Sequence, residues 1–481
     1  MASAAALGGR AGLIAGPLAA GAMLALGPPA GLSGAAWLTL ALLALMVIWW
    51  VSEALPVAAT ALLPLCVLPS FGVVSARDAA APYADPIVFL FIGGFMLAGA
   101  VEKWGLHKRL ALGVAGALGD RPIALVGGFL LSAGLLSMWI SNTATALILA
   151  PIALGVAQVV SGGRDLDRVC GAGLVLAVAY GASIGGIGTP IGSPTNLVAM
   201  SYLERNGLSL TFTQWMALAT PLMIVMLLAA FAILGLYVAL RGAPAAAGGG
   251  GVIRAAYRAL GPMTAPEMRV LGVFALVALL WMTRELYSAL PGLGAINDTA
   301  IALAGAVVLF LLPSGDQERP SAPLLDWATA ERIPWGIALL FGAGLSMADA
   351  MEATGVTQWL AQNLTWLDGY APLVVIAAIV VLTVFVSELA SNVATLSAFL
   401  PIVGGIAAAT GIDPLLLVFP ACMGASLAFM LPIGTPPNAI AYATGLPSMR
   451  LMISLGLALN VIGVVAISAI SAALGPMILA P

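Results

Sequence analysis

Residues 137–152 read SMWISNTATALILAPI, and residues 387–402 read SELASNVATLSAFLPI. Both stretches follow the pattern SxxxSNxAT and end in Pro-Ile, at a spacing of 250 positions (387 minus 137). Each stretch lies at the centre of an apolar block, 123–157 or 372–407, which is too long for one membrane helix of about 20 residues. We therefore expect each block to fold as two helical arms joined at a polar tip.

The same spacing relates further positions of the two halves of the chain. Glu102 and Gly105 recur as Glu352 and Gly355. A shift of 242 then superposes two Pro- and Gly-rich motifs, PIGSPTN at 190–196 and PIGTPPN at 432–438. Several motifs that recur in one order at a nearly constant offset indicate an internal duplication.

The composition places this duplication in a membrane. Of the 481 residues, 62% are hydrophobic and 8% are charged, whereas soluble domains carry roughly a quarter charged residues. The apolar blocks between the motifs are about 20 residues long, which suits a hydrocarbon core of about 30 Å. The net charge of -3 gives no indication of a nucleic-acid partner.

The blocks divide the chain into four parts. The first 30 residues resemble a signal peptide, but Gly27, Pro28 and Pro29 end the run without a clear cleavage site, so we expect a retained membrane helix. A Gly- and Ala-rich stretch then separates the repeats. The expected parts are an N-terminal helix (1–35), a first repeat (36–241), a cytoplasmic linker (242–269) and a second repeat (270–481).

The basic residues set an orientation. If the N-terminus is cytoplasmic and each hairpin returns to the side it left, all of the 17 Lys and Arg residues except Arg77, Arg205 and Arg284 face the cytoplasm. Each repeat then crosses the membrane five times, so the second repeat is inverted relative to the first. Inverted repeats with a binding site at their interface are a transporter architecture. The expected location is the inner membrane of a bacterium.

Length alone does not separate a re-entrant tip from a full helical hairpin, because an arm such as 123–140 spans about 27 Å. The surroundings favour the re-entrant form. The polar residues at 141–143 sit among Met138, Trp139, Ile140 and Leu147, which a water-exposed tip would not need. Non-helical backbone at membrane depth is tolerated where it lines a protein or aqueous cavity.

The two pairs of motifs carry matching chemistry. Ser hydroxyls, Asn carbonyl oxygens and free backbone carbonyls are neutral oxygen ligands for an alkali cation, while hydroxyl and amide donors hold a carboxylate. In the PIG motifs, Pro and Gly interrupt a helix, and Ser193, Thr435, Asn196 and Asn438 add polar groups. Ser and Asn also join helices without binding ligands, and Pro also makes simple kinks. The duplication favours a site at mid-membrane.

Other functions have weaker support. The only histidine is His107, and the cysteines Cys66, Cys170 and Cys422 lie far apart in apolar segments. A hydrolytic membrane enzyme therefore lacks an evident base or metal motif. A passive channel remains an alternative. Glu388 and three further acidic residues near apolar blocks are compatible with proton coupling; these are Glu53, Asp349 and Glu352.

The sequence resembles the divalent anion/sodium symporter family, the sodium-coupled dicarboxylate and sulfate carriers. The resemblance rests on the two SN motifs, WWVSEALPVAATALLPL (49–65), GASIGGIGTPIGSPTN (181–196) and LPIGTPPNAI (431–440). It implies an all-α polytopic protein with eleven membrane helices and two re-entrant hairpins. It also implies a homodimer with scaffold and transport domains that moves as an elevator.

The resemblance also assigns a site. It implies two sodium sites, one formed by Ser137, Ser141, Asn142 and Gly192 and the other by Ser387, Ser391, Asn392 and Gly434. It implies substrate contacts from Ser141, Asn142, Thr143, Ser193, Ser391, Asn392, Thr435 and Pro436. The second motif departs from the pattern, since Val393 lacks the hydroxyl that Thr143 provides in the first.

No Lys or Arg occurs in any of these motifs. A dianion must then be neutralised by bound cations and helix dipoles, which favours cation coupling. Two separated tips suit a molecule with two carboxylates. We expect sodium-coupled symport of a four-carbon dicarboxylate such as succinate, malate or fumarate. A carrier for citrate, sulfate or another divalent oxyanion is the alternative.

Overall fold

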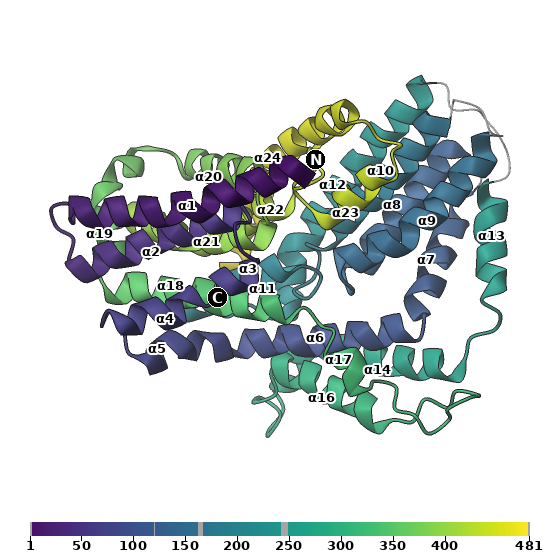
Figure 1. Ribbon diagram of the computed structural model, residues 1–481. Coiled ribbons are helices and arrows are strands. Elements are labelled where there is room, and N and C mark those ends of the chain that lie inside the picture. Colours follow the sequence, from purple (N-terminus) through teal and green to yellow (C-terminus); the bar gives the residue numbers. More distant parts are fainter. Residues whose placement is uncertain (1, 120, 162–166, 242–248, 480–481) are drawn as a thin grey trace.

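The computed structural model describes residues 2–119, 121–161, 167–241 and 249–479 (Figure 1). Within these residues every regular element is an α-helix or a short 3-10 helix, and one isolated β-bridge joins Pro313 to Pro323. The prediction of an all-α fold is confirmed.

The helices of the two repeats correspond one to one. The first repeat contains α6 (Pro86–Lys103), α7 (Leu106–Ala117), α8 (Pro122–Ser137), α9 (Asn142–Ser161), α10 (Asp167–Gly185), α11 (Pro194–Arg205) and α12 (Phe212–Leu240). Their counterparts are α18 (Trp335–Ala353), α19 (Val356–Asn363), α20 (Pro372–Ser387), α21 (Asn392–Thr410), α22 (Leu415–Ser426), α23 (Pro436–Ala443) and α24 (Met449–Leu479). Even the left-handed turns match, with φ of 74° at Gly105 and 82° at Gly355, a conformation that glycine adopts without strain.

The remaining helices precede or connect these two matching sets, except for η2, which lies between α19 and α20. They are α1 (Ala2–Leu26), α2 (Gly34–Val51), α3 (Val57–Thr60), α4 (Leu63–Ser70), α5 (Ala76–Ala80), η1 (Ala81–Ala84), α13 (Gly249–Ala259), α14 (Ala265–Met282), α15 (Arg284–Ser288), α16 (Asp298–Leu311), α17 (Trp327–Ala330) and η2 (Thr365–Gly369). The N-terminal helix packs against α2, and the indole of Trp37 donates to the Met23 carbonyl at 2.7 Å.

One pair of counterpart helices, α6 and α18, is brought together start to end. The guanidinium of Arg205, at the end of α11, pairs with Asp85 at the N-cap of α6 (3.0 Å) and with Asp349 in the last turns of α18 (2.5 Å). The start of α6 therefore lies beside the end of its counterpart α18. This is the relation that inverted repeats require.

The hairpins and the interrupted helices interlock across the two repeats. Hairpin α8–α9 packs against α10 of its own repeat and α23 of the other, while α20–α21 packs against α22 and α11. The hairpins lie on opposite sides of the molecule, α8–α9 at the right and α20–α21 at the left of Figure 1. The long helices α12 and α24 pack against each other. In addition, α12 packs against α8 and α24 packs against α20, the first arms of the two hairpins.

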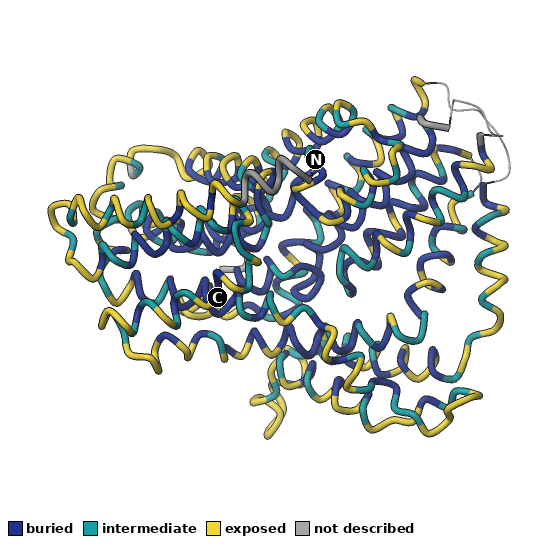
Figure 2. Tube along the Cα trace, in the orientation of Figure 1, coloured by how far each residue is buried: buried dark blue, intermediate teal, exposed yellow. Residues whose placement is uncertain are grey.

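The outer surface is suited to lipid. Eight stretches are long and apolar enough to cross a membrane; they are Gly34–Val51, Ala76–Lys103, Asn142–Val160, Phe212–Leu240, Ala265–Met282, Trp335–Ala353, Asn392–Thr410 and Met449–Gly475. Large apolar side chains on α12 and α24 are exposed, such as Leu228 (62%) and Val465 (65%), and exposed residues line the periphery in Figure 2. Several hairpin arms and half-helices are shorter, so the expected number of eleven membrane helices stays a prediction.

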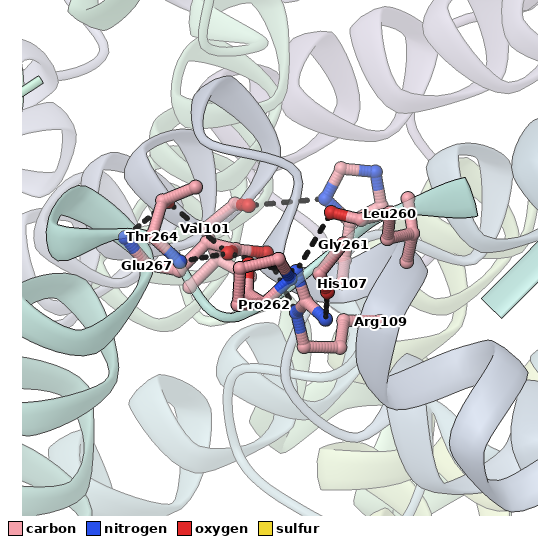
Figure 3. A network of polar contacts seen from close by, with 8 residues as sticks. All are labelled: Val101, His107, Arg109, Leu260, Gly261, Pro262, Thr264 and Glu267. Carbon is pink, nitrogen blue, oxygen red and sulfur yellow. Dashed lines mark hydrogen bonds and ion pairs between the residues drawn. The ribbon is translucent and has the colours of Figure 1, made fainter. Parts of the chain in front are cut away.

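The connection between the repeats is more ordered than the linker expected at 242–269. Residues 242–248 lie outside the described residues, but α13 follows directly and packs against α7 and α9. The guanidinium of Arg109 on α7 then pairs with Glu267 at 2.9 Å (Figure 3). It also donates to backbone carbonyl oxygens between α13 and α14, those of Leu260, Gly261 and Pro262. This clamp ties the end of the connection to the first repeat.

Candidate functional site

The tip of the first hairpin meets the loop between α10 and α11. A Cβ atom added to Gly192 would lie 2.7 Å from the carbonyl oxygen of Gly186, 2.9 Å from that of Ser137 and 3.1 Å from that of Met138. Only glycine fits between these three oxygens. Backbone carbonyls that converge where a membrane helix is unwound are the ligands that transporters offer to sodium.

The side chain of Asn142 joins the same cluster. It contacts the Ser137 hydroxyl, and a Cβ at Gly186 would lie 2.5 Å from its Oδ1. In the amide orientation that satisfies hydrogen bonding, Nδ2 donates to the carbonyl oxygens of Ala182 and Gly192, each at 3.3 Å. The predicted ligands Ser137, Asn142 and Gly192 are thus in one place, at the contact between tip and loop.

The tip of the second hairpin is attached differently. Glu388, which occupies the position of Met138, is 3% exposed and accepts hydrogen bonds from the backbone N–H groups of Phe429, Met430 and Leu431 at 2.7–3.0 Å. Nδ2 of Asn460 on α24 donates to Oε1 at 2.7 Å. A buried carboxylate is stable only with such a full set of donors. Glu388 therefore binds the second tip to the loop between α22 and α23.

Of the predicted sodium ligands of the second repeat, Gly434 lies beside this carboxylate. A Cβ at Gly434 would lie 3.4 Å from Oε2 of Glu388. The Ser387 hydroxyl donates to the Val384 carbonyl at 2.9 Å. Oδ1 of Asn392 is buried without a hydrogen-bond partner among the described residues. A buried oxygen without a partner calls for an explanation, and a bound cation would supply one.

The asparagines that end the two PIG motifs have the same role in both repeats. Nδ2 of Asn196 donates to the carbonyl oxygens of Gly186 and Thr189, each at 2.8 Å. Nδ2 of Asn438 donates to those of Ala428 and Leu431, each at 3.1 Å. Both pairs of acceptors lie ten and seven residues earlier in the chain. Each asparagine therefore closes its own loop through its Nδ2 group, while Oδ1 of Asn438 is buried without a hydrogen-bond partner among the described residues.

The other predicted substrate residues lie at helix starts and tips. Ser193 and Thr435 are the N-caps of α11 and α23, and Pro436 is exposed at the start of α23. Oγ of Ser141 accepts from the Ala144 N–H at 3.1 Å. At the next position of the two tips, Thr143 is partly exposed and Val393 is 8% exposed. Ser391, at the second tip, is also partly exposed.

Sequence reasoning missed three residues that hold the site together. They are Glu388 and the pair Thr195 and Ser426, whose hydroxyl groups lie 2.7 Å apart. The sequence analysis placed Glu388 among acidic residues compatible with proton coupling, and in the structure its oxygens accept hydrogen bonds from backbone and side-chain amides. Thr195 stands within the quoted motif, and the only signal was that Pro437 replaces it in the second repeat. Nothing in the sequence connected Ser426 with either motif.

Groups that suggested other chemistry are engaged elsewhere. Nδ1 of His107 lies 3.0 Å from the Val101 carbonyl oxygen (Figure 3), and burial lowers the pKa of His107, so the ring is neutral at pH 7. Asp349 is paired with Arg205. Among the described residues, no group of three His, Cys, Asp or Glu side chains is placed to bind a metal.

Two interrupted helices, two hairpin tips and an oxygen-rich contact in each repeat define a membrane transport protein of the inverted-repeat class. The model of the family described as "Sodium:sulfate symporter transmembrane region" matches residues 11–480, and the chain belongs to this family.

Curated relatives agree with this assignment, and solved structures share the fold. The sodium-dependent dicarboxylate transporter SdcS of Staphylococcus saprophyticus is 37% identical, over 95% of this chain and 89% of its own. SdcS of Staphylococcus aureus strain USA300 is 36% identical over the same shares. The YdaH transporter of Alcanivorax borkumensis has a similar fold, with a TM-score of 0.60 at 13% identity over 90% of this chain and 98% of its own. The antimetabolite efflux pump MtrF of Neisseria gonorrhoeae gives 0.54 at 15% identity over 84% and 83%.

Proposed function

We propose that the protein is a secondary active transporter that imports a four-carbon dicarboxylate together with sodium. The observation that carries the proposal is the pair of contacts between hairpin tip and loop, one in each repeat. The first is lined by backbone carbonyl oxygens and the second by the Glu388 carboxylate, and neither contains Lys or Arg. A dianion held between two such contacts needs bound cations for neutrality. The SdcS relatives are named as sodium-dependent dicarboxylate transporters.

Each repeat would provide one sodium site and one end of the substrate site. Ser137, Ser141, Asn142 and Gly192 form the first cation site, and Ser387, Ser391, Asn392 and Gly434 the second. The substrate lies between the tips, in contact with Ser141, Asn142, Thr143, Ser193, Ser391, Asn392, Thr435 and Pro436. The amides at the starts of α11 and α23 favour anionic groups there.

The sharpest test is uptake of labelled succinate by purified protein in proteoliposomes. A sodium gradient should drive uphill accumulation, and replacing sodium by choline should abolish it. Malate and fumarate should compete. Robust sulfate or citrate uptake without succinate uptake would instead favour the oxyanion alternative, and accumulation that never exceeds equilibrium would indicate a channel.

We further propose that the protein is a homodimer in the bacterial inner membrane, with a cytoplasmic N-terminus and elevator-type movement. The orientation rests on the distribution of basic residues. Cysteines placed at the exposed residues Gly251 and Ala289 should react with impermeant reagents from opposite sides of the membrane. Cys66 is the exposed native cysteine, whereas Cys170 and Cys422 are buried, so Cys66→Ala provides the background. Labelling of both positions from one side would overturn the orientation.

A further inference from the structure

Three buried hydroxyl groups connect the loop of the first repeat to a helix of the second. Oγ of Ser193 lies 2.7 Å from Oγ1 of Thr195, which lies 2.7 Å from Oγ of Ser426 on α22. The Ser426 hydroxyl in turn contacts the Cys422 carbonyl oxygen at 2.9 Å. The three side chains are 6%, 0% and 3% exposed. The row therefore runs through the core, where each group needs a partner.

Counting protons fixes the direction of this row. A carbonyl oxygen only accepts, so the single proton of Ser426 goes to Cys422. The contact between Thr195 and Ser426 must then use the proton of Thr195, and the contact between Ser193 and Thr195 must use that of Ser193. No other assignment gives all three contacts a proton. Ser193 therefore has only lone pairs left to offer to a ligand.

The counterpart of Ser193 in the second repeat has the opposite character. Thr435 caps α23 in the usual way, with Oγ1 accepting from the Asn438 N–H at 3.4 Å. Pro437 stands where the first repeat has Thr195, so the acceptor that takes the Ser193 proton is missing there. Within the described part of the chain the Thr435 proton has no recorded acceptor. Thr435 is thus able to donate to a carboxylate.

We propose that Ser193 is a ligand of the coupling sodium ion in the first repeat, and that Thr195 and Ser426 are positioning residues that keep its hydroxyl turned as an acceptor. Thr435 is the hydroxyl that donates to the substrate. The proposal rests on the proposed function and replaces the assignment of Ser193 to the substrate. A carboxylate facing Ser193 would place two hydrogen-bond acceptors against each other. A hydroxyl whose proton is donated to a row of further hydroxyls is, in contrast, a stronger ligand for a cation. The neighbouring Gly192 already borders three carbonyl oxygens.

The test compares Thr195→Val with Thr195→Ser in succinate uptake. Val has the same shape but cannot accept the Ser193 proton, so the Ser193 hydroxyl turns away from Thr195. The sodium concentration for half-maximal uptake should then rise roughly fivefold, which corresponds to the free energy of about one hydrogen bond. The succinate KM at saturating sodium should stay within about twofold or fall. Thr195→Ser restores the hydroxyl and should behave as the wild type.

Ser426→Ala provides a second variant that leaves the residues of the first motif themselves unchanged. It removes the acceptor of the Thr195 proton, so sodium dependence should shift in the same direction. An increase in succinate KM with unchanged sodium dependence in both variants would overturn the proposal. So would a change confined to malate, because the partner of Ser193 would then be a substrate hydroxyl. Sodium-driven uptake by the wild type in the same vesicles tests the proposed function separately.

Discussion

The contacts between tip and loop in the two repeats have the same backbone plan but different chemistry. In both, the asparagine that ends the PIG motif, Asn196 or Asn438, closes the loop by donating to two backbone carbonyl oxygens. In the first, the Thr189 hydroxyl binds the Met138 carbonyl and accepts from the Gly192 N–H. In the second, the carboxylate of Glu388 performs this task. Duplication has therefore preserved the geometry of the site while making its charge unequal.

This inequality has a consequence for cation binding. The first contact consists of neutral oxygens, whereas the second holds a buried negative charge close to Gly434. An opposite charge within a few ångströms attracts a cation strongly where water is excluded. We therefore expect the second repeat to bind sodium more tightly than the first. The variants below test how far the two contacts differ.

Glu388→Gln should have the largest effect. The amide cannot accept at both ends, so backbone N–H groups of the 429–431 loop lose their partner, and hydrogen bonds to a charged group contribute about 1.5–3 kcal/mol each. We expect a loss of about 3–5 kcal/mol in the free energy of unfolding and loss of uptake. Thermal unfolding in detergent measures the first. Met138→Leu, at the equivalent position, is the control and should change stability by less than about 1.5 kcal/mol. If Glu388→Gln is as stable as the wild type, the carboxylate does not hold the 429–431 loop.

Asn196→Ala and Asn438→Ala should have the next largest effect, and an equal one. Each variant breaks two hydrogen bonds from Nδ2 to buried carbonyl oxygens, which we expect to lower stability by roughly 2–3 kcal/mol. Asn196→Ala also removes the weak contact from the Cys422 thiol. Unfolding temperatures of the two variants measured side by side test the symmetry. A large difference between them would mean that the loops are not equivalent.

Glycine substitutions should show an asymmetry of intermediate size. A Cβ at Gly192 would come within 2.7–2.9 Å of backbone oxygens that cannot turn away, whereas at Gly434 the nearest atom is the Ala428 Cβ at 3.1 Å. Gly192→Ala should therefore cost about 2 kcal/mol of stability and most of the uptake, and Gly434→Ala less than about 1 kcal/mol. Equal losses in the two variants would contradict the described difference in packing.

Exchanging the residues that follow the two SN pairs should have the smallest effect. Val393→Thr adds a hydroxyl to the second tip and should tighten succinate binding by about one hydrogen bond, roughly 1 kcal/mol. Thr143→Val should weaken it by a similar amount without affecting folding. Succinate KM at saturating sodium reports both changes. If both variants leave KM unchanged, neither position contacts the substrate.

Much of the fold was predictable, because its signals are local or repeated. The Ser-Asn pairs located both tips, and helices α9 and α21 begin at Asn142 and Asn392. The partners of polar groups were not predictable. Glu388 meets residues 41 and 72 positions away, and Thr195 meets Ser426 at a separation of 231. Such pairs depend on how the interrupted helices cross, which no spacing in the sequence reveals.

The most direct test of the central claim is a sodium titration of succinate uptake in the wild type, Asn142→Ala and Asn392→Ala. Each variant removes the side-chain amide of a tip asparagine from one contact, and each coupled ion contributes about 1.4 kcal/mol per tenfold gradient. Asn363→Ala, an exposed asparagine whose amide binds the Trp359 carbonyl, is the control. We predict that both site variants need several-fold more sodium for half-maximal uptake and accumulate less succinate, while the control matches the wild type. Unchanged sodium dependence in both site variants would contradict a cation site at each contact.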